Sequence, residues 1–177
     1  MTTPRAVVLV EGESDRVALR TLAAMSGRDL AGEGIEIIAM GGVTNTRAFA
    51  SRYGPHGLGL RLAGLYDAAD ESIVRRGLAS AGLTAQDFFK CTADLEDELI
   101  RALGVEAVEA VIEAAGEMRS LRLLAGMPAQ RDWTRDAVLR RFIGVRSGRK
   151  ARYARLLVEA LEPGSVPLPL AAVLARV

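Results

Sequence analysis

The sequence predicts an α/β fold in which a mainly parallel four-stranded sheet is flanked by helices and followed by a C-terminal helical extension. Three observations support this prediction. Short apolar runs alternate with helical patterns in the first half of the chain, as expected when right-handed crossovers join parallel strands. No convincing strand follows Thr92. An acidic residue directly follows the first and third apolar runs, the strand ends from which α/β folds do their chemistry.

The individual elements are predicted from apolar periodicity and from cap residues. Five consecutive apolar residues, 6–10, are typical of a strand buried on both faces. The strands are predicted at about 5–10, 35–40, 62–66 and 88–91, with helices between them at 14–26, 44–53 and 70–81. Later helices are predicted at 94–103, 105–115, 117–125, 134–143 and 147–161, with a short one after Pro169.

Length and composition indicate one structural unit, divided into an α/β core over 1–92 and a helical extension over 93–177. The chain has 177 residues, half of them hydrophobic, which is close to a common single-domain size. No apolar run reaches the roughly 18 residues of a membrane span, and residues 1–4 do not resemble a signal peptide. We therefore expect a cytoplasmic protein with no membrane partner. The single cysteine, Cys91, is expected to be a small buried hydrophobe.

Charge is unevenly distributed, although the formal net charge is only +1. Residues 94–117, the acidic block, carry eight acids and one base, a net charge of −7. Residues 131–155, the basic block, carry nine bases and two acids, a net charge of +7. The basic block could contact a polyanionic backbone. Solvated helix faces, or pairing with the acidic block, would explain it equally well.

Two acids are predicted to meet at the carboxyl edge of the sheet. Glu11 follows the first strand and Asp67 follows the third, and parallel strands end at a shared edge. Asp15 falls one turn after Glu11, in a helix that we expect Ser14 to cap. Carboxylates this close suit a divalent cation with oxygen ligands. The helix dipole would also explain Asp15 without any metal.

Neighbouring residues could complete this site. Asp70 and Glu71 stand at the predicted start of the third helix, and the Gly41-Gly42 turn could bring backbone amides close to a phosphate. Each feature also has an ordinary structural explanation, because Asp70 could cap the helix and paired glycines are common in turns.

These motifs resemble those of a known family. Glu-Gly-x-x-Asp at residues 11–15, with an aspartate after the third strand, looks like a Toprim domain, which topoisomerases, bacterial primases and several nucleases share. A closer resemblance, over about residues 5–160, is to the Toprim half of OLD (overcoming lysogenization defect) family endonucleases, through residues 9–15, 94–96 and 148–150. It implies a Toprim-like (Rossmann-like) sheet, an acidic cluster for one or two Mg²⁺ or Mn²⁺ ions, and a lysine that assists phosphodiester cleavage.

The resemblance also implies roles for single residues. Glu11 would be a metal ligand or general acid/base, Asp15 would ligate the second ion, and Asp67 matches the first aspartate of an Asp-x-Asp pair. Ala69 stands where the family has the second aspartate. The missing carboxylate would then have to come from one of the next two residues, Asp70 or Glu71.

The later motifs imply a lysine and a further acid. Lys150, one of only two lysines against twenty-one arginines, would be the catalytic lysine, a compact and strongly hydrated charge. Its helix position places it on the apolar stripe that faces the protein. Glu96 would be a metal ligand, although acids also favour a helix N-terminus. The expected phosphate contacts, of which the last three should lie nearer the solvent side, are Arg146, Arg149, Arg152 and Arg155.

Other classes of site are poorly supported. The only histidine, His56, has no cysteine or histidine companion, which argues against a zinc site or a serine-histidine triad. Acids at positions 13 and 15 would repel the pyrophosphate of a dinucleotide. No Gly-x-x-x-x-Gly-Lys-Ser/Thr loop occurs, so we expect ATP dependence only through a separate ATPase partner. The sequence is also compatible with assembly into a homo-oligomer.

We therefore expect a divalent-metal-dependent nuclease, or a related phosphoryl-transfer enzyme, acting on nucleic acid, with DNA favoured over RNA. Metals held by Glu11, Asp15 and Asp67 would activate water, and Lys150 would stabilise the transition state. Ala69 favours an alternative, a catalytically inactive nucleic-acid-binding or regulatory module. A third hypothesis is a scaffold subunit whose charged helices pair with a partner or with each other.

Overall fold

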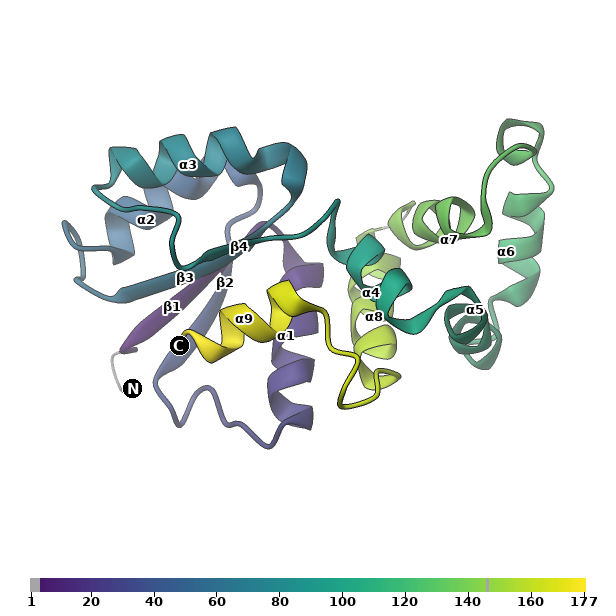
Figure 1. Ribbon diagram of the computed structural model, residues 1–177, viewed down its shortest axis with the longest axis horizontal. Coiled ribbons are helices and arrows are strands. Elements are labelled where there is room, and N and C mark those ends of the chain that lie inside the picture. Colours follow the sequence, from purple (N-terminus) through teal and green to yellow (C-terminus); the bar gives the residue numbers. More distant parts are fainter. Residues whose placement is uncertain (1–3, 146) are drawn as a thin grey trace.

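The computed structural model describes residues 4–145 and 147–177 and contains a four-stranded sheet (Figure 1). Its strands are β1 (Ala6–Val10), β2 (Ile35–Ala39), β3 (Arg61–Tyr66) and β4 (Phe88–Lys90). The spatial order is β2-β1-β3-β4, and each neighbouring pair is parallel. The predicted parallel sheet is confirmed, and the loops that follow its strands leave from one shared edge.

Helices cover both faces of this sheet. β1 is fully buried, and its side chains alternate between two apolar clusters. Val7 and Leu9 belong to the cluster with α2 (Thr46–Tyr53) and α3 (Glu71–Ser80), whereas Val8 belongs to the cluster with α1 (Glu13–Met25). Figure 1 shows α2 and α3 on one side of the sheet and α1 on the other. Burial on both faces explains why β1 is an unbroken apolar run.

The second half of the chain is helical, as predicted. Its helices are α4 (Leu95–Leu103), α5 (Val105–Ala114), α6 (Met118–Ala125), α7 (Arg135–Gly144), α8 (Ser147–Glu159) and α9 (Leu168–Ala175). α8 packs along α1, and α9 returns to β3 and β4, while α5, α6 and α7 lie farther from the sheet (Figure 1). Short 3-10 turns at Val43–Asn45 (η1), Ala68–Asp70 (η2) and Pro128–Gln130 (η3) precede α2, α3 and α7.

The beginning of α1 differs from the prediction. The N-cap residue is Gly12, and Ser14 is buried within the first turn instead of capping it. The N–H of Gly12 donates a hydrogen bond of 2.9 Å to the Asp15 carboxylate. Glycine has no side chain with which to cap the helix, and the carboxylate of Asp15, at the third helical position, satisfies the N–H of Gly12 itself.

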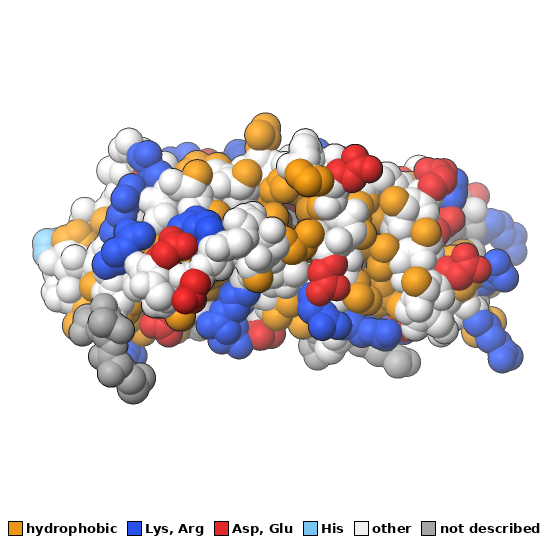
Figure 2. Space-filling view, turned by 90° about the horizontal axis from the view of Figure 1, so that it is seen from below, with side chains coloured by type: hydrophobic (Ala, Val, Ile, Leu, Met, Phe, Trp, Pro, Cys, Tyr) orange, Lys and Arg blue, Asp and Glu red, His pale blue; other side chains and the backbone are white. Residues whose placement is uncertain are grey.

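The acidic and basic blocks are paired with each other in space. The ion pairs between them join Arg135 to Glu106 and Glu109, Arg140 to Asp94, Arg149 and Arg152 to Glu117, and Lys150 to Glu96. Figure 2 shows lysine and arginine side chains beside acidic ones over much of the face that it presents. Intramolecular pairing therefore explains much of the basic block, as one of the interpretations of the charge pattern proposed.

The fold also bears on membrane spans and on the single cysteine. Within the described residues, no helix combines the length and the apolar character needed to cross a bilayer. Cys91 is fully buried, as predicted, and burial raises the pKa of its thiol above the ordinary value. A thiol that stays protonated behaves as a small hydrophobe.

Candidate metal centre and the adjoining pocket

Glu11 lies in the turn between β1 and α1, at the carboxyl edge of the sheet. Its backbone carbonyl accepts hydrogen bonds from the N–H groups of Gly41 (3.0 Å) and Gly42 (3.2 Å). Both glycines have positive φ values, 73° and 129°, which residues with a Cβ rarely adopt. The glycine turn thus fixes the backbone of Glu11. Because both N–H groups already bond within the protein, a phosphate contact through them stays a prediction.

Three carboxylates converge at this edge from two separate loops. Glu11 follows β1, Asp67 follows β3, and Asp70 closes the 3-10 turn before α3. One oxygen from each lies within 4.8 Å of the others. The Asp70 side chain makes no capping hydrogen bond to α3, so the helix-cap interpretation does not account for it. Asp70 stands directly after Ala69 and brings a third carboxylate to the cluster.

Burial and mutual repulsion make negative charge unfavourable in this cluster. Burial, reinforced by the neighbouring acids Asp15 and Asp94, raises the pKa of Asp67 to about 7. Burial raises the pKa of Asp15 to about 6, although the N–H of Gly12 acts in the opposite direction. The pKa of Glu11 is raised by burial and then by Asp70. A divalent cation would relieve this repulsion.

The donor set fits a hard cation. Every ligand atom offered by Glu11, Asp67 and Asp70 is a carboxylate oxygen, the type that Mg²⁺ and Mn²⁺ prefer over nitrogen and sulfur. A set of three side chains would also leave coordination positions for water or for a phosphate oxygen, as is usual for Mg²⁺ in phosphoryl-transfer sites.

Lys150 and Glu96 form an ion pair beside these carboxylates. Lys150 Nζ lies 3.4 Å from Glu96 Oε1, an atom that is buried and accepts no hydrogen bond from the described residues. The Glu96 side chain is only 5% exposed, and that of Lys150 is 40% exposed. Burial alone would lower the pKa of Lys150, but Glu96 and Asp15 raise it above its ordinary value. The ammonium therefore stays charged at neutral pH.

Several of the predicted site residues share one pocket. A pocket of about 350 Å³ is lined by the β1–α1 turn, the Gly41-Gly42 turn, Asp67, Glu96 and Lys150. Lys150 lies on α8, and its stripe of Tyr153, Ala154 and Leu157 is buried as predicted. α8 packs along α1, and this packing brings a lysine from late in the chain to the edge of the sheet.

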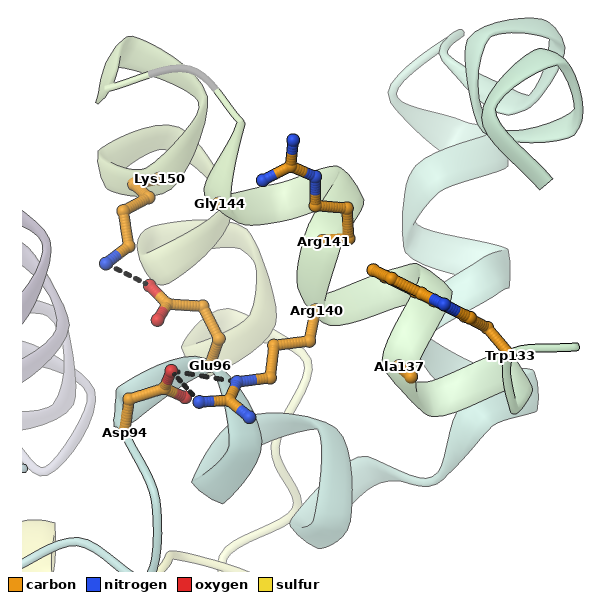
Figure 3. Close-up of a pocket in the computed structure, with 8 residues that line it drawn as sticks. All are labelled: Asp94, Glu96, Trp133, Ala137, Arg140, Arg141, Gly144 and Lys150. Atoms are coloured by element: carbon orange, nitrogen blue, oxygen red, sulfur yellow. Dashed lines mark hydrogen bonds and ion pairs between the residues drawn. The ribbon is translucent and has the colours of Figure 1, made fainter. Parts of the chain in front are cut away.

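A second pocket, of about 530 Å³, adjoins the first through Glu96 and Lys150, which line both. Its other lining residues are Asp94, Trp133, Ala137, Arg140, Arg141 and Gly144 (Figure 3). No site role is predicted from the sequence for Trp133, Arg140 or Arg141. Arg140 and Arg141 fall within the predicted helix 134–143 and Trp133 lies just before it, but the path from these residues to Glu11 depends on tertiary packing.

Other predicted site residues lie apart from the three-carboxylate cluster. Glu71 pairs with Lys90 at 2.9 Å and with Arg75 at 2.8 Å, and both partners lower its pKa, Lys90 the more. It does not join Glu11, Asp67 and Asp70.

The arginines proposed for phosphate contacts are held by other partners. Arg149 is only 15% exposed, pairs with Glu117 at 2.7 Å and lies over the Phe142 ring, so its predicted place near the solvent is wrong. Arg152 also pairs with Glu117, at 2.5 Å. Arg155 lies 3.9 Å from Glu159. Arg146 lies outside the described residues.

A comparison with protein families gives a match over the first part of the chain. Residues 4–68 match the family model described as the overcoming lysogenization defect protein-like TOPRIM domain. Residues 4–68 are thus similar to an OLD-like Toprim domain. This OLD-like Toprim segment includes β1, β2 and β3 with Glu11, Asp15 and Asp67, and it ends before Asp70 and Lys150.

Solved structures extend the likeness to the helical half. The C-terminal region of the OLD protein of Xanthomonas campestris pv. campestris is 25% identical, with a TM-score of 0.67 and coverage of 99% of this chain and 95% of that one. The C-terminal region of the Burkholderia pseudomallei OLD protein is 22% identical, with a TM-score of 0.69 and coverage of 98% and 96%. The fold is thus Toprim-like, with further C-terminal helices. No curated protein matches the chain.

Proposed function

We propose that this OLD-like Toprim protein is a divalent-metal-dependent nuclease that hydrolyses phosphodiester bonds in nucleic acid, with DNA favoured over RNA. One observation carries the proposal: the carboxylates of Glu11, Asp67 and Asp70 converge beside a charged lysine. Carboxylates that hold cations, next to a fixed positive charge, are the groups that phosphoryl transfer requires.

The cation site would be formed by Glu11, Asp67 and Asp70, and Asp15 and Glu96, which line the same pocket as Glu11 and Asp67, would serve a second ion. Bound Mg²⁺ or Mn²⁺ would supply Lewis acidity and offset the negative charge of the phosphate. With its raised pKa, Glu11 is suited to accept a proton from the attacking water. Lys150 would stabilise charge that develops on the phosphoryl oxygens or the leaving oxygen.

The roles of Glu96 and of the glycine turn follow from their contacts. Glu96 holds the ammonium of Lys150 at the pocket wall through a buried carboxylate, so the charge is in place before substrate binds, which reduces reorganisation during the reaction. The Gly41-Gly42 turn fixes the backbone of Glu11 through two hydrogen bonds and thereby orients the residue proposed as general base.

Cleavage of labelled single-stranded DNA, duplex DNA and RNA by the purified protein tests this function. Mg²⁺ or Mn²⁺ should support cleavage, and EDTA should abolish it. Glu11→Gln should lower the rate by at least about a hundredfold, because a residue that ligates the cation and moves a proton contributes through both effects.

The matched control is Glu71→Gln, which changes a nearby carboxylate that pairs with Lys90 and Arg75 instead of joining the cluster. It should leave cleavage within about threefold, since surface pairs contribute little. Equal loss of activity in the two variants would contradict the proposed centre. Cleavage that persists unchanged in EDTA would contradict the metal dependence.

Ala69 supports a second candidate function, a nucleic-acid-binding or regulatory module without turnover. The Asp-x-Asp pair of the family lacks its second acid here, and Asp70 reaches the cluster from the following position. Tight metal-dependent binding of nucleic acid without cleavage would favour this module. Cleavage that appears only when a separate ATPase is added would instead identify that ATPase as the partner. Cleavage that appears only when the chain self-assembles would identify a homo-oligomer as the active form.

A further inference from the structure

The pocket beside the proposed metal centre is formed by one face of α7 and the loop before it. Ala137, Arg140, Arg141 and Gly144 lie on α7. Ala137 and Gly144 are each three or four residues from the two arginines, so these four residues lie on one side of the helix. Trp133 lies in the loop before α7 begins. Because Ala137 and Gly144 are small, the pocket lies open between the larger side chains that line it. Its volume of about 530 Å³ lies within the usual size range for ligand pockets.

Trp133 offers an accessible aromatic surface at this pocket. It is the only tryptophan in the chain, and it is 44% exposed, whereas Val138 and Leu139 of the following helix α7 are buried in the core. A large indole normally contributes to folding by being buried. An indole left open at a pocket wall is suited to stacking against a planar ligand. Figure 3 shows it across the pocket from Glu96 and Lys150.

The two arginines of the pocket differ in their partners. Arg140 is held by Asp94 through hydrogen bonds of 2.8 and 2.6 Å. Arg141 is exposed, and it forms no ion pair or side-chain hydrogen bond with any residue of the ranges 4–145 and 147–177. Its guanidinium therefore has its full set of donors available for a phosphate, with which it can form paired hydrogen bonds.

The pocket is continuous with the proposed catalytic site. Lys150 and Glu96 line both, so a strand with its scissile phosphate near Lys150 would lead a flanking nucleotide directly into the second pocket. There a base would meet the indole, and a backbone phosphate would meet Arg141. Inside a duplex, each base face is already covered by its neighbours, so a nucleotide there must be unpaired or unstacked to present a free face to the indole.

We propose that this pocket binds an unpaired nucleotide flanking the cleavage site, with its base stacked on Trp133 and its phosphate paired with Arg141. The inference rests on the proposed nuclease function and specifies its substrate as nucleic acid with a single-stranded or unstacked segment. Sequence preference is not expected from this contact, because every base offers an aromatic face.

The fluorescence of Trp133 measures this contact directly, since no other tryptophan contributes. A short single-stranded oligodeoxynucleotide, titrated into the full chain in Ca²⁺ and again in EDTA, should quench the emission and protect it from acrylamide. A blunt duplex of the same length and concentration should do neither. Unchanged emission and acrylamide access with the single strand under both conditions would overturn the proposal, and so would equal quenching by the duplex.

Variants then separate stacking from charge. Trp133→Ala should weaken binding of a dye-labelled single strand about tenfold, as expected for one stacked base, and Trp133→Phe should retain most of the affinity. Arg141→Ala should weaken binding and reduce the slope of log affinity against log salt by roughly 0.7, the value for one phosphate contact on a single strand. Arg119→Ala, an exposed arginine on α6 outside the pocket, should change neither quantity.

The outcomes distinguish this inference from the nuclease proposal. Cleavage that requires metal but is equally fast on blunt duplexes and on single strands, with Trp133→Ala unchanged, would overturn the nucleotide pocket and leave the metal centre standing. Quenching and protection of Trp133 by single strands, without cleavage in any metal, would support the pocket and contradict the nuclease. If Trp133→Ala fails to fold, the acrylamide experiment on the parent protein still decides.

Discussion

Lys150 is the residue whose predicted role gains most from its surroundings. Its charge is maintained by Glu96 and Asp15. If this charge acts mainly in the transition state, Lys150→Ala should lower the cleavage rate by at least about tenfold, roughly 1.4 kcal/mol, with little change in nucleic-acid affinity. Lys150→Arg should not restore the full rate, because a planar guanidinium cannot replace a compact ammonium. Single-turnover rates and binding titrations measure the two effects.

The chain provides its own control for that substitution. Lys90 is the only other lysine, and it pairs with Glu71 at 2.9 Å outside the pocket. Lys90→Ala should leave the cleavage rate unchanged. If Lys150→Ala lowers affinity as much as it lowers rate, Lys150 anchors a phosphate instead of stabilising the transition state.

Asp67 and Asp15 should make the metal-free protein less stable as pH rises. Their pKa values in the folded state, about 7 and about 6, exceed the value of about 3.9 expected in the unfolded chain. Between about pH 4 and pH 7 the folded state therefore binds more protons, and the free energy of unfolding falls as pH increases. Urea unfolding in EDTA across this range should show the decline, and Asp67→Asn should reduce it.

Metal should reverse this trend. Protons and cations compete for the same oxygens, so Mg²⁺ should raise the melting temperature more at about pH 8 than at about pH 5. Asp67→Asn should weaken the effect at the higher pH, whereas Glu71→Gln should not, since Glu71 lies outside the cluster. A Mg²⁺ shift that is the same at both pH values would argue against binding by these carboxylates.

At the scale of elements, β3 sets the position of Asp67 through its contacts with both neighbouring strands. A Cβ at Gly64 would lie 2.8 Å from the Leu9 carbonyl oxygen and would overlap the Phe88 ring. Gly64→Ala should therefore lower the free energy of unfolding by about 2 kcal/mol, because the close approach of the strands leaves no space for a methyl group. Chemical denaturation measures this change.

A glycine in an open position is the comparison for Gly64. Gly148 lies in α8, and a Cβ there would contact nothing within 4 Å. Gly148→Ala should stabilise the protein by about 0.5–1 kcal/mol, since alanine loses less backbone entropy in a helix. If Gly64→Ala were equally harmless, the tight packing of β3 between β1 and β4 would not hold.

At the scale of the whole molecule, the final helix ties the helical half to the sheet. Leu170 is fully buried, and α9 packs on β3 and β4. Leu170→Ala should lower the free energy of unfolding by about 2–5 kcal/mol. Leu168→Ala, on the same helix but 84% exposed, should change it by less than about 0.5 kcal/mol.

The same variants test whether the chain unfolds as one unit. Trp133 fluorescence reports on the helical extension, and far-ultraviolet circular dichroism reports on all the helices. One apolar cluster includes residues of β1, α1, α7, α8 and α9, so both transitions should coincide and shift together in Leu170→Ala. A Trp133 transition that does not move would mean that residues 1–92 and 93–177 unfold separately.

Local sequence determined the sheet, its parallel direction and the strand-end acids. A run such as residues 6–10, buried on both faces, and a glycine turn after it leave few alternatives, because strand burial and backbone sterics act over short distances. The convergence of Glu11 and Asp67 at one edge of the sheet followed from the parallel topology alone. The cap of α1 was predicted wrongly at Ser14, because the backbone turn at Gly12 let Asp15 satisfy the N–H instead.

Tertiary structure alone decided which of the remaining charged residues belong together. Asp70 and Glu71 are adjacent in sequence, yet one joins the carboxylate cluster and the other pairs with Lys90. Likewise Arg140 is neutralised by Asp94, whereas Arg141 has no such partner among the described residues. Charges on neighbouring residues acquire different partners because an ion pair depends on spatial distance and burial, and these are set by how α7 and α8 pack against α4 and α1.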